Sequence, residues 1–222
     1  MESFSQNIRE KDFLTYKMLK NLTLILSFFF ISTSLCLASD IREFEIGSKV
    51  KKIPNQRYNN IKCLEDNKKI KYWKNYKRCK KNEDGLFYVN FEYNDKYAFN
   101  ENFEGTQVAG HPVIISIGIN SSGILSRINL KTDPSAPFYF KKQAHLFWLR
   151  IYSKYGSNDW TCKHFEQKEN HLIINKKYVN KSCYKVYKNK KITYQTEFYF
   201  IGDREKENLI SRTQMSVSEI IS

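Results

Sequence analysis

The fold is decided at Val113-Ile-Ile-Ser-Ile-Gly-Ile-Asn-Ser-Ser-Gly-Ile-Leu-Ser-Arg-Ile-Asn-Leu130, where two alternating apolar segments flank a turn. Alternation with a period of two predicts half-buried strands, and Asn120-Ser-Ser-Gly123 has the composition of a tight turn. The segments therefore predict an antiparallel hairpin whose apolar residues share one face. The pairing expected across this loop is Ile119 with Ile124, Ile115 with Ile128 and Val113 with Leu130.

A helix is predicted directly after this hairpin. Asp133 is the expected N-cap, Pro134 or Pro137 suits the first turn, and Gly156 is a typical terminator. Basic residues lie mostly opposite the apolar stripe, so this amphipathic helix should lie across the sheet. The stripe comprises Ala136, Phe140, Ala144, Phe147, Trp148, Ile151 and Tyr155.

Further strands are predicted on both sides of this unit. Ser39–Asn60 reads as an irregular opening segment, and Asn94–Gly105 reads as a loop. The fold class that follows is α+β: a mainly antiparallel β-sheet with one principal amphipathic helix packed on it. The additional strands are expected at Leu86–Tyr93, Trp160–Phe165, His171–Tyr178, Ser182–Tyr187, Lys191–Ile201 and Leu209–Val217.

Residues 1–38 predict an export signal. The basic stretch Lys17-Met-Leu-Lys20 precedes an apolar run over residues 22–31, and Cys36-Leu-Ala38 supplies a small-x-small cleavage site. We expect cleavage after Ala38 and one globular domain over residues 39–222, in the periplasm or outside the cell.

Other readings of this segment remain open. An uncleaved anchor is the main alternative, although Leu22–Ala38 is short, at 17 residues, and contains several Ser and Thr; this segment would then be the protein's only contact with the membrane. Lipidation at Cys36 is disfavoured because Leu35, not a small residue, precedes it. Met18 is a natural start, so residues 1–17 are interpreted as an upstream extension.

The cysteine count agrees with export. Cys36 leaves with the signal, and the even number that remains predicts two disulfides in an oxidising compartment. Of the three connectivities we favour the sequence-local one, in which each bridge contributes about 3 kcal/mol by restricting the unfolded chain. The expected pairs are Cys63–Cys79 and Cys162–Cys183.

A metal site is the competing interpretation of the same residues, with free thiols as a third. Cys162-Lys-His164 is a local pair of ligand types, and His171 and Cys183 lie downstream. Zinc sites usually have ligands two to four residues apart, and that spacing does not recur here. We therefore expect no metal and no cofactor.

The chain has a formal net charge of +14, and residues 1–38 hold four basic and three acidic groups, so the charge belongs to the remainder. Lys68–Lys81 is the sharpest basic and aromatic stretch, of a kind that can bind a polyanion or a sugar chain. The alternative is a solvated loop whose lysines reflect codon bias. Export argues against a nucleic-acid partner. The candidate anion- or glycan-binding residues are Lys71, Tyr72, Trp73, Lys74, Lys77 and Arg78.

No catalytic set is evident. The histidines lie outside nucleophile elbows, paired-histidine zinc helices and phosphate loops, and His145 is expected to be a packing residue on the helix. Carboxylates occur as scattered pairs such as Glu65/Asp66 and Glu83/Asp84, with Asp95, Glu101 and Glu104 nearby in sequence. We expect no catalytic residue, so an enzyme is the less favoured class.

Several motifs together resemble a group of uncharacterised exported bacterial proteins. They are the hairpin from Val108 onward, the helix opening Thr132-Asp-Pro134, a helix that ends at Gly156, and Trp160-Thr-Cys162. The resemblance covers about half of the exported part. It implies a periplasmic location and paired cysteines, and it implies no activity.

Three functions are compatible with these observations. The first is a non-enzymatic domain that binds an anionic envelope component or another envelope protein. The alternative is a hydrolase of cell-wall or glycan substrates that uses acidic residues. The third is a structural or assembly factor of the envelope.

Overall fold

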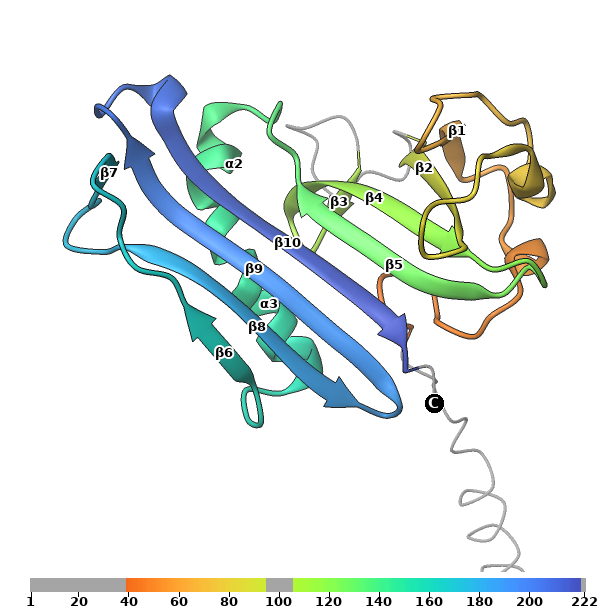
Figure 1. Ribbon diagram of the computed structural model, residues 1–222. Coiled ribbons are helices and arrows are strands. Elements are labelled where there is room, and N and C mark those ends of the chain that lie inside the picture. The colour runs from red at the N-terminus through yellow and green to blue at the C-terminus, as the bar shows by residue number, and fades with distance from the viewer. Residues whose placement is uncertain (1–38, 95–105, 221–222) are drawn as a thin grey trace, which may run out of the picture. The chain divides into compact units, whose positions relative to one another are not determined.

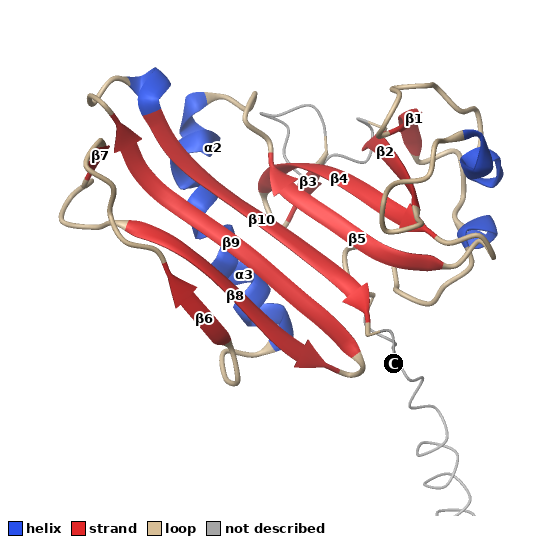
Figure 2. Ribbon diagram, viewed as in Figure 1, coloured by secondary structure: helices blue, strands red, loops and turns tan. Residues whose placement is uncertain are grey.

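One antiparallel sheet organises the chain, and a single helical segment lies across one of its faces (Figures 1 and 2). The computed structural model describes residues 39–94 and 106–220, in a compact unit that begins at Ser39. The predicted signal over 1–38 and nearly all of the predicted loop at Asn94–Gly105 lie outside the described residues.

The strand order across the sheet is β1-β2-β4-β5-β10-β9-β8-β6, with β3 pairing β4 and β7 pairing β9. The fold class is therefore the α+β arrangement that the sequence predicts. The strands are β1 Tyr58–Cys63, β2 Phe87–Tyr93, β3 Gln107–Val108, β4 His111–Ile119, β5 Leu125–Thr132, β6 Thr161–His164, β7 His171–Leu172, β8 Val179–Tyr187, β9 Lys190–Ile201 and β10 Leu209–Glu219. Short 3-10 helices are η1 Val50–Lys52, η2 Trp73–Arg78 and η5 Lys206–Asn208.

The predicted central hairpin is β4–β5, and its register differs from the expected one by two residues. Ile117 faces Ile128, whereas the sequence predicts Ile115 in that place. One residue of the shift comes from the loop, since Ile119 faces Leu125 and not Ile124. The other comes from a bulge, because the next pair is Gly118 with Arg127. A shift of two keeps Ile128 and Leu130 on the predicted face, whereas next to the turn Leu125 takes the buried place predicted for Ile124.

Two other strand predictions need correction. His171–Tyr178 contains only the two-residue β7 and one isolated bridge, between Ile174 and Lys177. The opening segment is not wholly irregular, since β1 already begins at Tyr58 and pairs with β2. Both errors fall on edges of the sheet, where the apolar alternation on which the predictions rest is weakest.

The helical segment runs over Phe138–Tyr155 as α2 Phe138–Gln143, the 3-10 turn η4 Ala144–Phe147 and α3 Trp148–Tyr155. Asp133 is not its N-cap, as the sequence predicts. Its Oδ1 accepts hydrogen bonds from the amide and hydroxyl of Ser135, at 2.8 and 2.7 Å, in a turn before the helix. Gly156, with a φ of 83°, follows the last helical residue as predicted.

Hydroxyl side chains of the sheet satisfy backbone groups at the 3-10 turn. Thr213 Oγ1 donates to the carbonyl of Ala144 at 3.0 Å, and Thr196 Oγ1 donates to that of His145 at 2.9 Å. The amide of His145 in turn donates to Ser211 Oγ at 3.1 Å. Thr196 and Thr213 are fully buried. Their side chains therefore join the centre of the helix to β9 and β10.

Replacing both buried hydroxyls, as Thr196→Val/Thr213→Val, should lower the free energy of unfolding by about 2–5 kcal/mol, because each change leaves a buried carbonyl with one donor fewer. Urea denaturation followed by circular dichroism measures this loss. Thr193→Val is the matched control, since Thr193 lies on β9 but on the opposite face and is half-buried. Equal losses in the two variants would contradict the role given to the hydroxyls.

The first disulfide, Cys63–Cys79, joins the end of β1 to the end of η2, as the sequence predicts. It holds η2 against the sheet, where Trp73 contacts Phe44, Tyr58 and Phe91 with ring centroids 5.1–6.3 Å apart. The aromatic cluster completes the core under β1 and β2.

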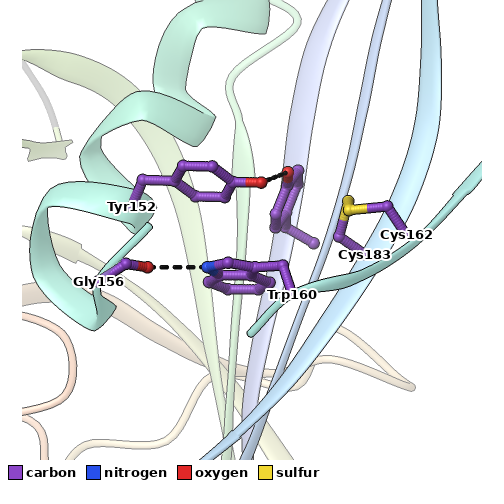
Figure 3. Close-up of a disulfide and its surroundings, with 6 residues drawn as sticks. Tyr152, Gly156, Trp160, Cys162 and Cys183 are labelled. Atoms are coloured by element: carbon purple, nitrogen blue, oxygen red, sulfur yellow. Dashed lines mark hydrogen bonds between the residues drawn. A yellow bond between two sulfur atoms is a disulfide. The ribbon is translucent and has the colours of Figure 1, made fainter. Parts of the chain in front are cut away.

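The second disulfide, Cys162–Cys183, also has the predicted pairing and joins the edge strand β6 to β8 (Figure 3). Trp160 lies just before β6, stacks on Tyr152 at a centroid distance of 5.2 Å, and donates its Nε1 hydrogen to the carbonyl of Gly156 at 2.8 Å (Figure 3). All four residues of β6 are exposed, so these two attachments carry much of its connection to the domain.

Candidate functional site

The basic and aromatic stretch does not form the surface that the sequence predicts. Trp73 is only 1% exposed and belongs to the core. Tyr76, in the same stretch, is buried and packs edge-on against Phe87. The prediction of Trp73 as a ligand-binding ring is therefore wrong, because the chain uses its apolar surface to close the core beside the disulfide.

The other members of this stretch remain at the surface. Lys71 and Lys74 place their Nζ atoms 5.3 and 5.5 Å from the ring centroid of Tyr72, which is half-buried. Lys77 and Arg78 are exposed. The structure thus leaves a small cationic group around one tyrosine.

A different surface is set apart by its composition: the sheet face opposite the helix. Residues that face one another across six adjacent strands form one polar row without a charge. A second row lies beside the first on the same face and includes Gln195 of β9 and Gln214 of β10, which face each other. In order from β2 to β8, the first row is Asn90, Ser116, Asn129, Ser216, Thr193 and Tyr184.

With the exception of Tyr184, these residues line a hollow with a volume of about 450 Å³. The volume is within the range of small-molecule sites in proteins. Leu64 and Ile114 supply apolar surface, and Lys131 is the one charged side chain among its lining residues. Carboxamides both donate and accept hydrogen bonds, and hydroxyls do the same. The hollow can therefore bind a polar uncharged molecule through many short contacts.

A second hollow, of about 490 Å³, adjoins the first and shares Gln195 with it. Its wall contains Glu197, which is 5% exposed, forms an ion pair with Arg212 and accepts a hydrogen bond from Tyr199 Oη at 3.0 Å. The ring of His171 stacks on Tyr199 at a centroid distance of 4.0 Å. The two hollows form a continuous polar groove along the open face, which we call the open-face groove.

One acceptor in each hollow has no partner among the described residues. The Oδ1 atoms of Asn90 and Asn180 are buried and form no hydrogen bond there. Asn90 lines the first hollow and Asn180 the second. Both oxygen atoms are covered by neighbouring residues, so they lie beneath the surface of the hollows.

Three titratable groups of the second hollow, His171, Tyr199 and Arg212, are held in their neutral or paired forms. Burial lowers the pKa of His171, with a further contribution from Lys168, which favours a neutral ring at physiological pH. Burial and the hydrogen bond to Glu197 raise the pKa of Tyr199 to about 12. The hydrogen bond to Glu197 raises that of Arg212.

This arrangement gives the hydrolase alternative little support. Glu166 and Glu197 are the carboxylates that line the second hollow, and Glu197 is already bound by an arginine and a phenol. Asp84 is bound in the same way, by Arg127 and Tyr88. His145 is a packing residue, stacked on Phe198 at 3.8 Å, and burial lowers its pKa to about 4.

The metal alternative loses two of its ligands, because Cys162 and Cys183 are bonded to each other. Among residues 39–94 and 106–220, no helix is long and apolar enough to cross a membrane.

No protein-family model, no curated protein and no solved structure matches the chain. The resemblance to exported bacterial proteins therefore stays a prediction.

Proposed function

We propose that the protein is an exported, non-enzymatic binding domain that holds an uncharged glycan of the cell envelope in the open-face groove. The observation that carries the proposal is the row of carboxamides and hydroxyls across six strands, in a chain with a net charge of +14. A solvated sheet face of such a chain would be expected to carry lysines. The first hollow has Lys131 alone among its described lining residues, which favours a ligand that needs many neutral contacts, while the second hollow also contains Glu166, Lys168, Glu197 and Arg212.

A glycan fits this surface better than an anion does. Its hydroxyl groups complement carboxamides and hydroxyls, and the groove extends over more than one sugar ring because two hollows adjoin at Gln195. Tyr184 is 46% exposed in the same row and offers an aromatic face on which a sugar ring can pack.

Export and location belong to the same proposal. Two disulfides indicate an oxidising compartment, and the predicted signal favours the periplasm or the exterior. The partner would then be an envelope component that the domain meets there.

Binding to immobilised neutral and anionic oligosaccharides tests the proposal. A neutral glycan should bind with an affinity that changes less than about twofold between about 0.05 and 0.5 M salt, since uncharged contacts are not screened. Asn129→Ala/Gln214→Ala should weaken this binding at least about tenfold, which corresponds to the loss of one or two hydrogen bonds.

The matched control is Gln56→Ala/Asn59→Ala, which removes one carboxamide of each kind from exposed positions that do not line the groove. Lys71→Ala/Lys74→Ala tests the competing surface around Tyr72. Retention of anionic glycans alone, lost in high salt and in the lysine variant, would overturn the proposal in favour of that surface.

A further inference from the structure

A hollow of about 320 Å³ lies on the helix-bearing side of the sheet and differs in chemistry from the open-face groove. Leu130 of β5 and Met215 of β10 line it from the sheet, and Phe147 and Ile151 line it from the helix. Ile41 and Val108 contribute from the segments on its other side. The lining is thus mostly aliphatic and aromatic.

An open apolar hollow of this kind is unusual in a folded protein. Interiors are packed to crystal-like density, and apolar cavities hold no ordered water because they give it no hydrogen bonds. Leu130, Phe147 and Ile151 belong to the hydrophobic core, so the hollow lies directly on the core's outer layer. A hydrocarbon chain would restore the missing contacts.

Cations surround the mouth of the hollow. Arg150 is exposed and forms no salt bridge with any described residue. Lys154 lies one helical turn further on and donates from Nζ to the carbonyl of Ser39 at 2.5 Å. Asp40 is the carboxylate among the described lining residues, and it is bound by Lys190 at 2.8 Å and by the amide of Ile46. The described residues at the mouth therefore carry an excess of positive charge.

Lys154 shares its nearest carboxylate, Asp40, with Lys190. Burial lowers the pKa of Lys154, and Asp40 raises it by less than burial lowers it, while Lys190 has a smaller lowering effect. A bound anion at the mouth would stabilise the charged form of Lys154 and pair with Arg150 at the same time.

We propose that this hollow binds a single-chain anionic amphiphile, a free fatty acid, with its hydrocarbon chain against Leu130 and Met215 and its carboxylate between Arg150 and Lys154. The volume lies at the lower end of ligand sites, which favours one chain over the two of a phospholipid. The hollow and the open-face groove lie on opposite faces of the sheet and share the lining residues Leu130 and Met215, but the proposal does not rest on the function proposed for the groove.

Calorimetric titration of the full chain with dodecanoate, below the micellar concentration, tests the site. Saturable binding of one molecule is expected, at least about tenfold tighter than that of dodecyltrimethylammonium, which has the same chain and the opposite charge. Arg150→Glu/Lys154→Glu should weaken dodecanoate binding at least about tenfold. Both residues are exposed, so the variant should fold, and circular dichroism would show whether it does.

The matched control is Lys51→Glu/Lys52→Glu, which makes the same charge change at two exposed residues that do not line the hollow. It should leave the affinity for dodecanoate within about twofold, because neither side chain lines the hollow and salt screens charges that lie outside it. Equal binding of the two amphiphiles, equal effects of the two variants, or retention on phosphatidylglycerol vesicles without saturable dodecanoate binding would each overturn the proposal.

Discussion

Trp73→Ala is expected to lower the free energy of unfolding by about 3–5 kcal/mol, the range for loss of a large aromatic side chain from a core. Trp73 is 1% exposed and contacts three other rings, Phe44, Tyr58 and Phe91. The alanine variant leaves a cavity that these rings can fill only in part, because Cys63–Cys79 holds η2 in place. Urea denaturation followed by near-ultraviolet circular dichroism measures the loss.

The neighbouring aromatic residue supplies the control. Tyr72 is half-buried beside two lysines, so Tyr72→Ala should cost about 1 kcal/mol or less. Trp73→Phe should cost much less than Trp73→Ala, since it keeps a ring and removes an indole N–H that has no acceptor among the described residues. Similar losses for Tyr72→Ala and Trp73→Ala would contradict the placement of Trp73 in the core.

Removal of the two disulfides should have unequal effects. The bridges close loops of similar length, with sequence separations of 16 and 21, so the chain-entropy contribution is about 3 kcal/mol for each. Cys63 and Cys79 are 0% and 5% exposed, whereas in the other bridge only Cys183, at 1%, is buried and Cys162 is exposed. Cys63→Ala/Cys79→Ala should therefore approach the upper end of the range of about 2–5 kcal/mol, and Cys162→Ala/Cys183→Ala the lower end.

Denaturation of both double variants, with native hydrogen exchange, distinguishes global from local effects. Loss of Cys162–Cys183 should speed exchange at β6 while β4 and β5 keep their protection. Loss of Cys63–Cys79 should lower protection across the sheet. A larger global loss from the exposed bridge than from the buried one would contradict this account.

The sequence is sufficient for the parts of the fold that depend on periodicity. The alternation in β4 and β5 predicts the hairpin and its faces, and the helical stripe predicts the helix, because burial of one face governs both patterns. The register differs because the loop and the bulge at Gly118 depend on local backbone geometry that alternation does not encode. Asp133 is misplaced for a similar reason, since the same residue type serves turns and caps equally well.

The candidate site is less accessible to sequence reasoning. The open-face groove forms only when six strands pair in register. The sequence alone therefore does not indicate that Asn90, Asn129 and Ser216 lie side by side. A signal was present, since the outward positions of β5 and β10 include uncharged residues where a lysine-rich chain would be expected to place charge. Trp73 is an error in the opposite direction. Its lysine neighbours in the sequence predict an exposed ring, but the disulfide holds its segment against the sheet and the ring is buried.

The short strand β6 has a consequence for the behaviour of the protein in a reducing environment. It covers part of the outer edge of β8, a nine-residue strand whose backbone groups would otherwise be unpaired. Reduction of the Cys162–Cys183 bridge would leave β6 held by its pairing with β8 and by Trp160 alone, so that edge would open more often and become a template for another chain. Self-association should then be stronger in the reduced protein than in the oxidised one. An oxidising compartment would therefore protect the protein from aggregation as well as stabilise its fold.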